Sequence, residues 1–155
     1  MDLEFQWCGN ENHDWERYKP TRKTPGSSGL DLAAYLSKPL KLKSGERILV
    51  PTGWKAKIAK GHELQVRSRS GMSYKYGVVV LNSPGTIDQD YQGEIKVLLF
   101  NSSKDDFTII NGMAIAQLVL CPVDMSAPVF VANKPLFEFE TERKEGGFGS
   151  TGDYK

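Results

Sequence analysis

The chain is divided into short β-prone runs by turn-forming residues, and this punctuation restricts its fold more than any other feature. Turn formers recur between the runs, as in Lys43-Ser44-Gly45, Ser83-Pro84-Gly85 and Asn111-Gly112. Gly, Pro, Asn and Ser are the residues that supply the backbone geometry of tight turns. Short strands at this regular spacing predict an all-β sandwich, jelly roll or barrel.

Several segments have the composition of strands. In Gly53–Ile58 the apolar residues at positions 54, 56 and 58 alternate with lysines, which is typical of a half-buried strand. Only Ser70–Tyr76 is expected to hold a helical turn or two. The expected strands are Leu3–Trp7, Asp31–Tyr35, Arg47–Val50, Gly53–Ile58, Glu63–Arg67, Val78–Leu81, Glu94–Asn101, Phe107–Ile110, Ile115–Pro122 and Val129–Val131.

The length predicts a single domain, because 155 residues lie within the usual range of about 100–200. Asn10–Ser28 is polar and contains proline, so we expect a long loop there. After Leu136 the chain becomes charged and then Gly-rich, a composition that favours neither a helix nor a packed strand. We therefore expect a β-barrel domain over residues 1–139 and, within the same domain, a flexible Gly-rich lid over 140–155.

Charge and cysteine content disfavour several classes of partner. The net charge is +1, from 20 basic and 19 acidic residues, which argues against duplex nucleic acid or an anionic membrane. Cys8 and Cys121 lack metal-binding spacing, as is typical of a reduced protein. The first residues do not resemble a signal peptide, and runs such as Val78–Leu81 are too short to span a bilayer. We expect a cytoplasmic protein (in the host cytoplasm if the chain is viral) that binds neither nucleic acid nor membrane.

The Gly-rich tail combines groups that suit a nucleotide. Backbone amides of Gly146–Gly152, two hydroxyls and the guanidinium of Arg143 are all phosphate donors, and Phe148 offers a flat apolar face. A frayed terminus is the alternative. A Walker A loop fails, because no lysine precedes Ser150 and no strand and helix flank the segment. We favour a tail that folds over a nucleotide.

Two internal segments carry further polar groups. Arg67–Gly71 presents two arginines and two serines before a short helix, an arrangement that favours an anion, although a solvated surface strand is the alternative. Asn82–Ile95 has turn formers at both ends and is expected to form a hairpin. In it, Asp88 is a candidate general base, but a turn-forming Asp and a core role for Tyr91 stay open. His13 and His62 have no nucleophile at a recognisable spacing.

In this order, the segments resemble the five motifs of the trimeric dUTPases (deoxyuridine triphosphate nucleotidohydrolases). The matching stretches are Pro25–Leu32, Arg69–Gly71, Gly85–Ile95, Gly112–Leu118, and Arg143 with Gly146–Gly152. The resemblance covers about Pro20 to Gly152. It implies a jelly-roll-like β subunit of the β-clip type, a homotrimer with shared active sites and a flexible C-terminal arm. The implied reaction is Mg²⁺-assisted hydrolysis of dUTP to dUMP and pyrophosphate, which limits uracil in DNA and supplies dUMP.

The resemblance also implies a role for each matching residue. Asp88 would deprotonate the water that attacks the α-phosphorus, and Tyr91 would pack beneath the deoxyribose and reject UTP. Uracil would be recognised by Asn82, Gly85, Thr86 and Ile87. Phosphates would be bound from a neighbouring subunit by Arg69, Ser70, Gly71 and Gln117. The tail would place Phe148 over the uracil and Arg143, Ser150 and Thr151 at the γ-phosphate, while Gly149 and Lys96 complete the expected substrate-binding set.

The metal would be held chiefly by the triphosphate, since the sequence has no dense carboxylate cage or His cluster. Asp31 would contact its water shell as an outer-sphere partner, and no side chain would bind the ion directly. Two alternatives stay open: a dCTP deaminase, and a non-catalytic regulatory relative of the same fold. The loop Gly9–Lys19 matches no family motif; its Trp15 and Tyr18 are expected to pack on the subunit surface, or else to mark a partner contact.

Overall fold

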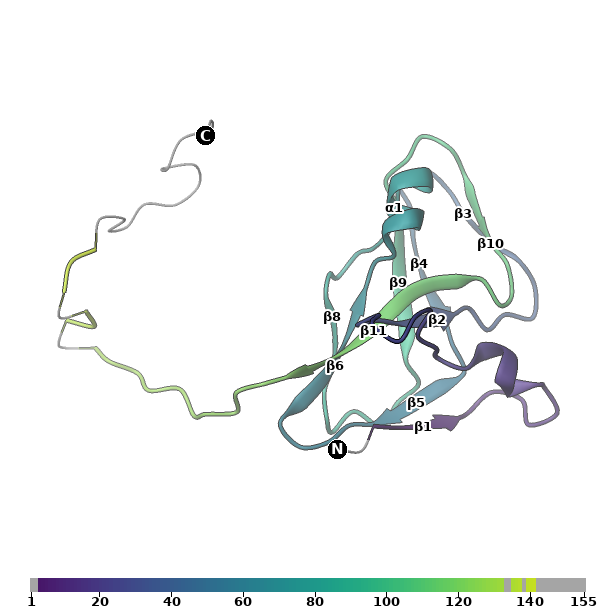
Figure 1. Ribbon diagram of the computed structural model, residues 1–155. Coiled ribbons are helices and arrows are strands. Elements are labelled where there is room, and N and C mark those ends of the chain that lie inside the picture. The colour runs from purple at the N-terminus through teal and green to yellow at the C-terminus, as the bar shows by residue number, and fades with distance from the viewer. Residues whose placement is uncertain (1–2, 133–134, 138, 142–155) are drawn as a thin grey trace. The chain divides into compact units, whose positions relative to one another are not determined.

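The computed structural model describes residues 3–132, 135–137 and 139–141 (Figure 1). The chain forms two units, the first ending at Met125 and the second beginning at Ser126. All helices and strands of the described residues lie in the first unit. The expected division at 139/140 between barrel and lid stays a prediction.

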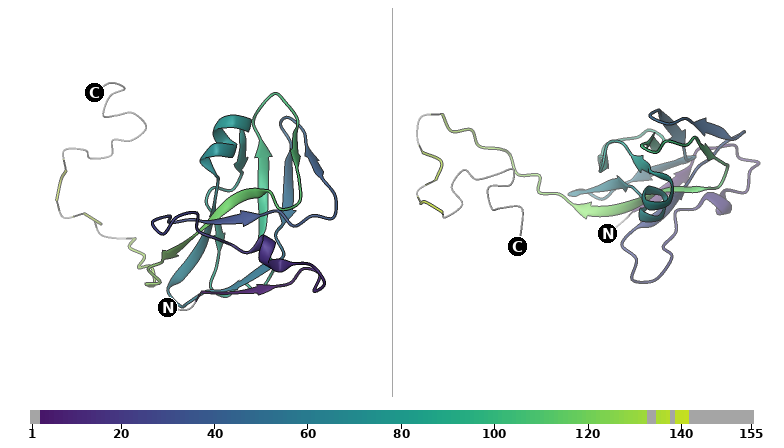
Figure 2. Two further views of the ribbon diagram at one scale, coloured as in Figure 1. Left: turned by 45° about the vertical axis from the view of Figure 1, so that its right-hand side comes forward. Right: turned by 90° about the horizontal axis from the view of Figure 1, so that it is seen from above.

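The regular elements of the first unit are almost all strands, as expected. Its elements are β1 (Glu4–Trp7), the 3-10 helix η1 (Trp15–Tyr18), β2 (Leu30–Ala33), β3 (Leu40–Leu42), β4 (Arg47–Pro51), β5 (Trp54–Lys57), β6 (His62–Arg67), α1 (Ser70–Tyr76), β7 (Val78–Val80), β8 (Gly85–Ile87), β9 (Lys96–Asn101), β10 (Phe107–Ile109) and β11 (Ala114–Pro122). These elements form an all-β, jelly-roll-like subunit (Figures 1 and 2).

A four-stranded sheet in the order β2-β11-β6-β8 carries most of the residues of interest. Its central strand β11 pairs antiparallel with both β2 and β6, and Gln117 stands opposite Asp31 on one side and Arg67 on the other. At the edge, β8 pairs antiparallel with β6, with Leu64 opposite Ile87. The antiparallel ladder thereby places side chains from motifs far apart in the sequence on neighbouring strands.

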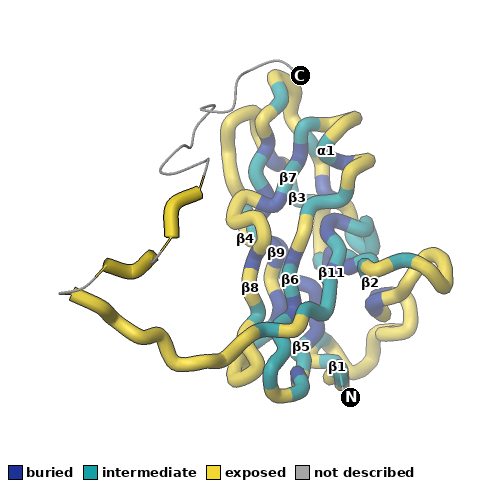
Figure 3. Tube along the Cα trace, turned by 60° about the vertical axis from the view of Figure 1, so that its left-hand side comes forward, coloured by how far each residue is buried: buried dark blue, intermediate teal, exposed yellow. Residues whose placement is uncertain are grey.

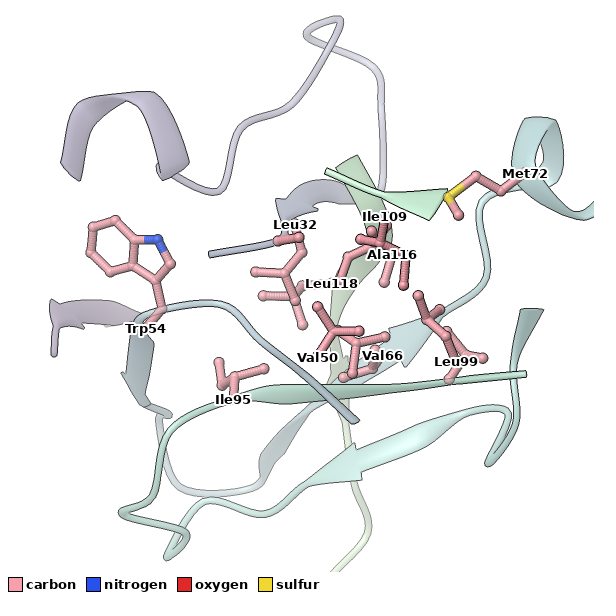
Figure 4. Packing of buried hydrophobic residues seen from close by; sticks show 14 of the residues in the cluster. Leu32, Val50, Trp54, Val66, Met72, Ile95, Leu99, Ile109, Ala116 and Leu118 are labelled. Atoms are coloured by element: carbon pink, nitrogen blue, oxygen red, sulfur yellow. The ribbon is translucent and has the colours of Figure 1, made fainter. Parts of the chain in front are cut away.

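The second sheet has three strands in the order β4-β9-β7, and two further pairs, β1-β5 and β10-β3, complete the unit. The hydrophobic core lies between the two larger sheets. In Figure 4, Leu32 and Leu118 of the first sheet face Val50 and Leu99 of the second, and all four are fully buried. Figure 3 shows buried positions alternating with more exposed ones along the strands, as expected for two-faced strands.

Most strand predictions are confirmed. Within the first unit each expected strand is present, with bounds that differ by no more than two residues. The alternation predicted for β5 is also present, since Trp54 and Ile58 are buried and Lys57 is exposed. The sequence did not predict β3, whose three residues find a partner only in β10, some 65 positions later in the chain. The long loop at Asn10–Ser28 contains the short η1.

The hairpin expected at Asn82–Ile95 is wrong. The β8 strand pairs with β6 in the four-stranded sheet, whereas β9 pairs with β4 and β7 in the three-stranded sheet. The intervening residues therefore cross from one sheet to the other. Turn formers at both ends indicated that the chain reverses here, but they do not show which strand will pair with which.

The second unit contains no helix or strand among its described residues, so the strand expected at Val129–Val131 is also wrong. A strand needs a neighbour for its backbone hydrogen bonds, and the strand pairings of the described residues include none for Val129–Val131. The described apolar side chains of this unit are exposed, with Val129 86% and Phe130 90% accessible. Among the described residues, no helix has the length and apolar character needed to cross a membrane.

Candidate active site

Arg69 is the N-cap residue of α1 and is held by acceptors of its own chain. Its Nε and Nη2 donate to the two carboxylate oxygens of Asp31, both at 3.2 Å, and its Nη1 donates to the carbonyl of Ala114 at 2.9 Å. The Asp31 side chain is 16% exposed and also lies 3.7 Å from Lys23 Nζ. This bidentate pairing fixes the orientation of the planar guanidinium. It thereby also fixes the position of the first turn of α1, which begins at the next residue.

The residue before Arg69 is held equally firmly. Ser68 accepts a bond from the backbone amide of Val80 on its Oγ, at 2.8 Å, and its carbonyl accepts from Gln117 Nε2, at 3.0 Å. Gln117 packs so closely against Gly29 that a Cβ at position 29 would collide with Oε1 of Gln117. The segment leading to the exposed Ser70 and Gly71 is therefore anchored on three strands, β2, β7 and β11.

The residues expected to recognise a base follow on β8 and the turn before it. Asn82 is exposed, and its amide lies 3.2 Å from where a Cβ on the buried Gly85 would stand. Thr86 is exposed and Ile87 is partly buried. Because β8 forms the edge of its sheet, its outer side is open to a ligand that pairs with backbone groups.

Asp88 follows β8 directly and is exposed in a cleft of about 300 Å³. The cleft is lined by His62, Glu63, Asp88, Gln89, Asp90, Val123 and Met125. The turn is held by the Tyr91 amide, which donates to the Asp88 carbonyl at 3.1 Å, and by Gln89, whose Oε1 accepts from the Gly61 amide at 3.1 Å. The carboxylate of Asp88 is thus presented to solvent on a turn that its neighbours secure.

Tyr91 is 45% exposed, so the alternative of a plain core residue does not apply. Its hydroxyl donates to the carbonyl of Glu94 at 2.9 Å, and its ring lies so close to Gly93 that a Cβ there would collide with the hydroxyl. Tyr91 lines a second cleft of about 560 Å³, formed with β1, β5 and the loop Gln89–Gln92. Lys96 is exposed and lies 3.9 Å from Glu94 Oε2.

The Asp31–Arg69–Gln117 group and Asp88 lie at opposite ends of the β6-β8 pair. Extending the register places Asp88 opposite Glu63, and Arg69 follows Glu63 by six residues. At about 3.3 Å per residue, Arg69 is roughly 20 Å from Asp88 along the strand direction, and Gln117, which stands opposite Arg67, is roughly 13 Å from it. Arg143, Phe148, Gly149, Ser150 and Thr151 lie outside the described residues.

Within the described residues, no group of three His, Cys, Asp or Glu side chains has the arrangement of a metal site. Both cysteines are free thiols. His13 Nδ1 lies 2.8 Å from the Tyr35 hydroxyl and His62 Nδ1 lies 3.2 Å from the Lys60 carbonyl, so neither of these contacts is with a Ser or Cys side chain. A hydrolytic triad is therefore not the chemistry that this part of the chain supports.

The N-terminal loop packs on the subunit. Tyr18 is buried, its carbonyl accepts a hydrogen bond from Trp54 Nε1 at 2.9 Å, and its ring stacks on Trp7 with ring centroids 5.4 Å apart. Trp15 is 41% exposed and meets Trp54 edge-on. The expectation that Trp15 and Tyr18 pack on the subunit surface is confirmed, and more fully for Tyr18.

The fold and these groups define a class: all-β, jelly-roll-like subunits that carry a solvent-exposed carboxylate next to an edge strand and a separate, ion-paired arginine segment. The chain matches the dUTPase family model over residues 16–152. Deoxyuridine 5′-triphosphate nucleotidohydrolase of Chlamydia pneumoniae is 52% identical over 133 residues, which cover 86% of this chain and 90% of that protein. The chain belongs to the dUTPase family.

Solved structures agree with this fold. The dUTPase of Staphylococcus bacteriophage 80alpha, in complex with dUpNHpp, superposes with a TM-score of 0.80 and is 23% identical, covering 97% of this chain and 98% of that chain. A variant dUTPase of phage phi11 of S. aureus, which coordinates a structural Mg(II) ion, gives a TM-score of 0.73 at 20% identity and covers 90% of this chain and 100% of that chain. At these identities the likeness concerns the fold.

Proposed function

We propose that this protein hydrolyses dUTP to dUMP and pyrophosphate. The observation that carries the proposal is the position of Asp88: a carboxylate on a secured turn, open to solvent, immediately after an edge strand that can pair with a base. The 52% identity to the Chlamydia pneumoniae enzyme supports the same reaction.

Base recognition follows from the open side of β8. Backbone donors and acceptors between Asn82 and Ile87 pair with the uracil edge as a neighbouring strand would. A cytosine exchanges donor and acceptor at N3 and at the 4-position and leaves polar groups of the site unpaired there, which is a strongly discriminating penalty. A C5 methyl group meets the backbone near Gly85, where even a Cβ would stand within 3.2 Å of Asn82 and 3.3 Å of Val66. These contacts favour dUTP over dCTP and dTTP.

The chemical step needs a water in line with the α-phosphorus. Asp88 accepts a proton from this water while the oxygen attacks phosphorus, and the bond to the bridging oxygen breaks with release of pyrophosphate. Tyr91 lies beneath the deoxyribose, where its fixed ring leaves no space for a 2′-hydroxyl. Little covalent help is needed, because positioning and charge neutralisation supply most of the rate enhancement for phosphoryl transfer.

Phosphate binding requires a second subunit. Arg69 lies roughly 20 Å from the Asp88 of its own chain, at about 3.3 Å per residue along the strand direction. We therefore infer that Arg69, Ser70, Gly71 and Gln117 serve the site of another chain. The bonds of Arg69 to Asp31 and of Gln117 to Ser68 fix the segment on which Ser70 and Gly71 are presented. We infer a homotrimer with shared sites, and the exposed apolar side chains Val129, Phe130, Leu136, Phe137 and Phe139 are the surface that assembly covers.

Mg²⁺ fits this arrangement when the triphosphate provides most of its ligands, since the described residues offer no cage of carboxylates and imidazoles. When bound, the ion polarises the phosphates as a Lewis acid. Asp31 already binds Arg69 through both oxygens, so it reaches the water shell only through its remaining lone pairs. Arg143, Phe148, Gly149, Ser150 and Thr151 close over the nucleotide as a lid that excludes bulk water.

The state of the cysteines indicates the cellular compartment. Free thiols at Cys8 and Cys121 suit a reducing compartment. We therefore assign the reaction to the cytoplasm, where deoxynucleoside triphosphates are found, with neither nucleic acid nor membrane as a partner.

The test is pyrophosphate release from dUTP, dCTP, dTTP and UTP with Mg²⁺, together with a mass measurement of the native oligomer. We expect rapid release from dUTP alone and a mass of three chains. Ammonia release from dCTP would instead identify a deaminase. A monomer, or a protein that leaves dUTP uncleaved in the presence of Mg²⁺, contradicts the proposal.

A further inference from the structure

The Glu94 side chain follows the loop that carries Tyr91 (Gln89–Gly93, here called the Tyr91 loop) and is hydrogen-bonded to a buried turn between β4 and β5. Its Oε1 accepts the backbone amides of Thr52 at 3.2 Å and Gly53 at 2.8 Å. The Glu94 side chain is only 25% exposed, and Thr52 is fully buried. Amide bonds to a charged acceptor are stronger than those to a neutral one, because charge assists the bond. The position of Glu94 is thus fixed relative to the turn between β4 and β5.

The next residue is fixed to the same turn by its backbone. Thr52 Oγ1 donates to the carbonyl of Ile95 at 2.6 Å, and the Ile95 amide donates to the carbonyl of Trp54 at 2.8 Å. Ile95 is fully buried. Four hydrogen bonds therefore tie residues 94 and 95 to the β4-β5 turn, and the carbonyl of Glu94 has a defined direction.

That turn is itself supported from the N-terminal side. Gly53 has a φ of 76° and packs so closely on the Trp7 ring that a Cβ there would collide with it. The Cys8 amide donates to the Gly53 carbonyl at 2.8 Å. Burial, and then the carboxylate of Glu94, raise the pKa of the Cys8 thiol, against the opposing charges of Lys55 and Lys96. Trp7 lies outside residues 16–152, which match the family model. The turn at Gly53 is therefore supported by an N-terminal segment that the family model does not include.

The carbonyl that this network orients is the acceptor of the Tyr91 hydroxyl, at 2.9 Å. Gly93, between the two, leaves space for the Tyr91 ring to lie against the backbone. We propose that Glu94 is a positioning residue for sugar selectivity: its carboxylate holds the loop so that Tyr91 stays where a 2′-hydroxyl would have to fit. The inference rests on the proposed function, since it concerns the same site.

The experiment compares Glu94→Ala, Glu94→Gln and Tyr91→Phe with the unaltered protein. The readout is the ratio of kcat/KM for dUTP to kcat/KM for UTP, which a general loss of stability does not move selectively. We expect Glu94→Ala to lower this ratio by about tenfold or more, because a mobile Tyr91 admits the ribose. Glu94→Gln keeps an oxygen acceptor for the two amides and should retain most of the ratio.

Tyr91→Phe removes the bond to the Glu94 carbonyl and keeps the ring, so it should lower the ratio in the same direction. The double variant Glu94→Ala/Tyr91→Phe should lose less than the product of the two single effects, because both interrupt one network. Glu46→Ala, an exposed carboxylate on another loop, is the matched control and should leave the ratio unchanged.

Two results would overturn the inference: an unchanged ratio in Glu94→Ala, or, if that variant fails to fold, an unchanged ratio in Tyr91→Phe. Both are distinct from failure of the proposed function, in which the unaltered protein itself does not cleave dUTP. Thermal unfolding and native mass of each variant separate a loss of selectivity from a loss of assembly.

Discussion

Asp88 lies in an open cleft beside His62 and Glu63, on a turn whose backbone is held by Tyr91. Because the Asp88 side chain has no role in securing that turn among the described contacts, its chemistry and its structural role are separable. We predict that Asp88→Asn lowers kcat by at least about 10³-fold, since the amide cannot accept the proton of the attacking water. Binding of a non-hydrolysable dUTP analogue should stay within about threefold of the unaltered protein.

Single-turnover kinetics and calorimetric titration measure the two quantities. Asp105→Asn, which replaces an exposed carboxylate on another loop, is the control and should retain near-normal turnover. Substantial hydrolysis by Asp88→Asn would remove Asp88 from the role of general base.

A surface pair at the other end of the molecule gives a pH-dependent prediction. Lys41 Nζ lies 2.9 Å from Asp106 Oδ2, and the Ser44 amide donates to Asp106 Oδ1 at 3.3 Å. The bond from Lys41, and then that from Ser44, lower the pKa of Asp106 below its ordinary 3.8. The bond to Asp106 likewise raises the pKa of Lys41 above 10.5.

The sign follows from the direction of each shift. A carboxyl with a lowered folded-state pKa contributes stability that is present above its unfolded value and is lost as pH falls through the folded value. We therefore expect the NMR titration of the Asp106 carboxyl to have its midpoint below 3.8, and Lys41→Met to move it upward. Lys38→Met, at another exposed lysine, should leave it in place; an unchanged midpoint in Lys41→Met would exclude the pairing.

At the scale of the element, α1 ends on a residue that only glycine suits. Gly77 has a φ of 64°, and its amide bonds to the carbonyls of Met72 and Ser73. A Cβ at position 77 would stand 3.0 Å from that of Ser103. We predict that Gly77→Ala destabilises the protein by about 1–2 kcal/mol, because a left-handed backbone costs an L-residue that amount.

Chemical denaturation measures this difference. Gly26→Ala is the matched control, since its φ is not positive and a Cβ there meets nothing within 4 Å. It should change the free energy of unfolding by no more than about 0.5 kcal/mol. Equal effects of the two substitutions would show that the backbone conformation at Gly77 is not what ends α1.

For the strands, the sequence predicted their positions but not their pairing. The alternation in β5 and the apolar run of β11 predict strands, because side chains on successive residues point to opposite faces. Turn formers predicted a hairpin over Asn82–Ile95, whereas β8 pairs with β6. Local turn chemistry reports a change of direction, but the pairing depends on which sheet buries each face.

For the whole molecule, the division after Met125 leads to a prediction about the tail. The hydrophobic core lies within the first unit, and among the described residues none of its members comes after Leu120. Removal of all residues after Glu142 should therefore leave the thermal midpoint within about 3 °C and preserve the trimer, as expected when no core contact is lost. The dUTP hydrolysis rate should fall by at least about 100-fold, because the lid groups are gone.

Pyrophosphate release and native mass check this outcome on the truncated protein. The control is removal of residues 153–155 only, which lie after the Gly-rich motif and should leave the rate nearly unchanged. A fully active truncation after Glu142 would refute the lid, and a monomeric one would place the determinants of assembly in the tail.

For the candidate site, the sequence predicted which residues matter but not which of them are in contact. Asp88, Tyr91, Arg69 and Gln117 could be selected from the sequence because their motifs are contiguous. That Arg69 is paired with Asp31, and that Gln117 bonds to Ser68, depends on strands that meet only in the folded sheet. Glu94 was not selected at all, since its partners Thr52 and Gly53 lie some 40 positions earlier.

By itself, the sequence determined that this protein is all-β, where most strands run and which short motifs carry polar chemistry, because side-chain periodicity and turn preferences act over a few neighbouring residues. The tertiary structure alone decided which strands pair, that Asp88 and Arg69 lie at opposite ends of one strand pair, and that a turn and an N-terminal tryptophan hold the Tyr91 loop. Those arrangements arise from burial and long-range hydrogen bonds, whose partners are far apart in the chain.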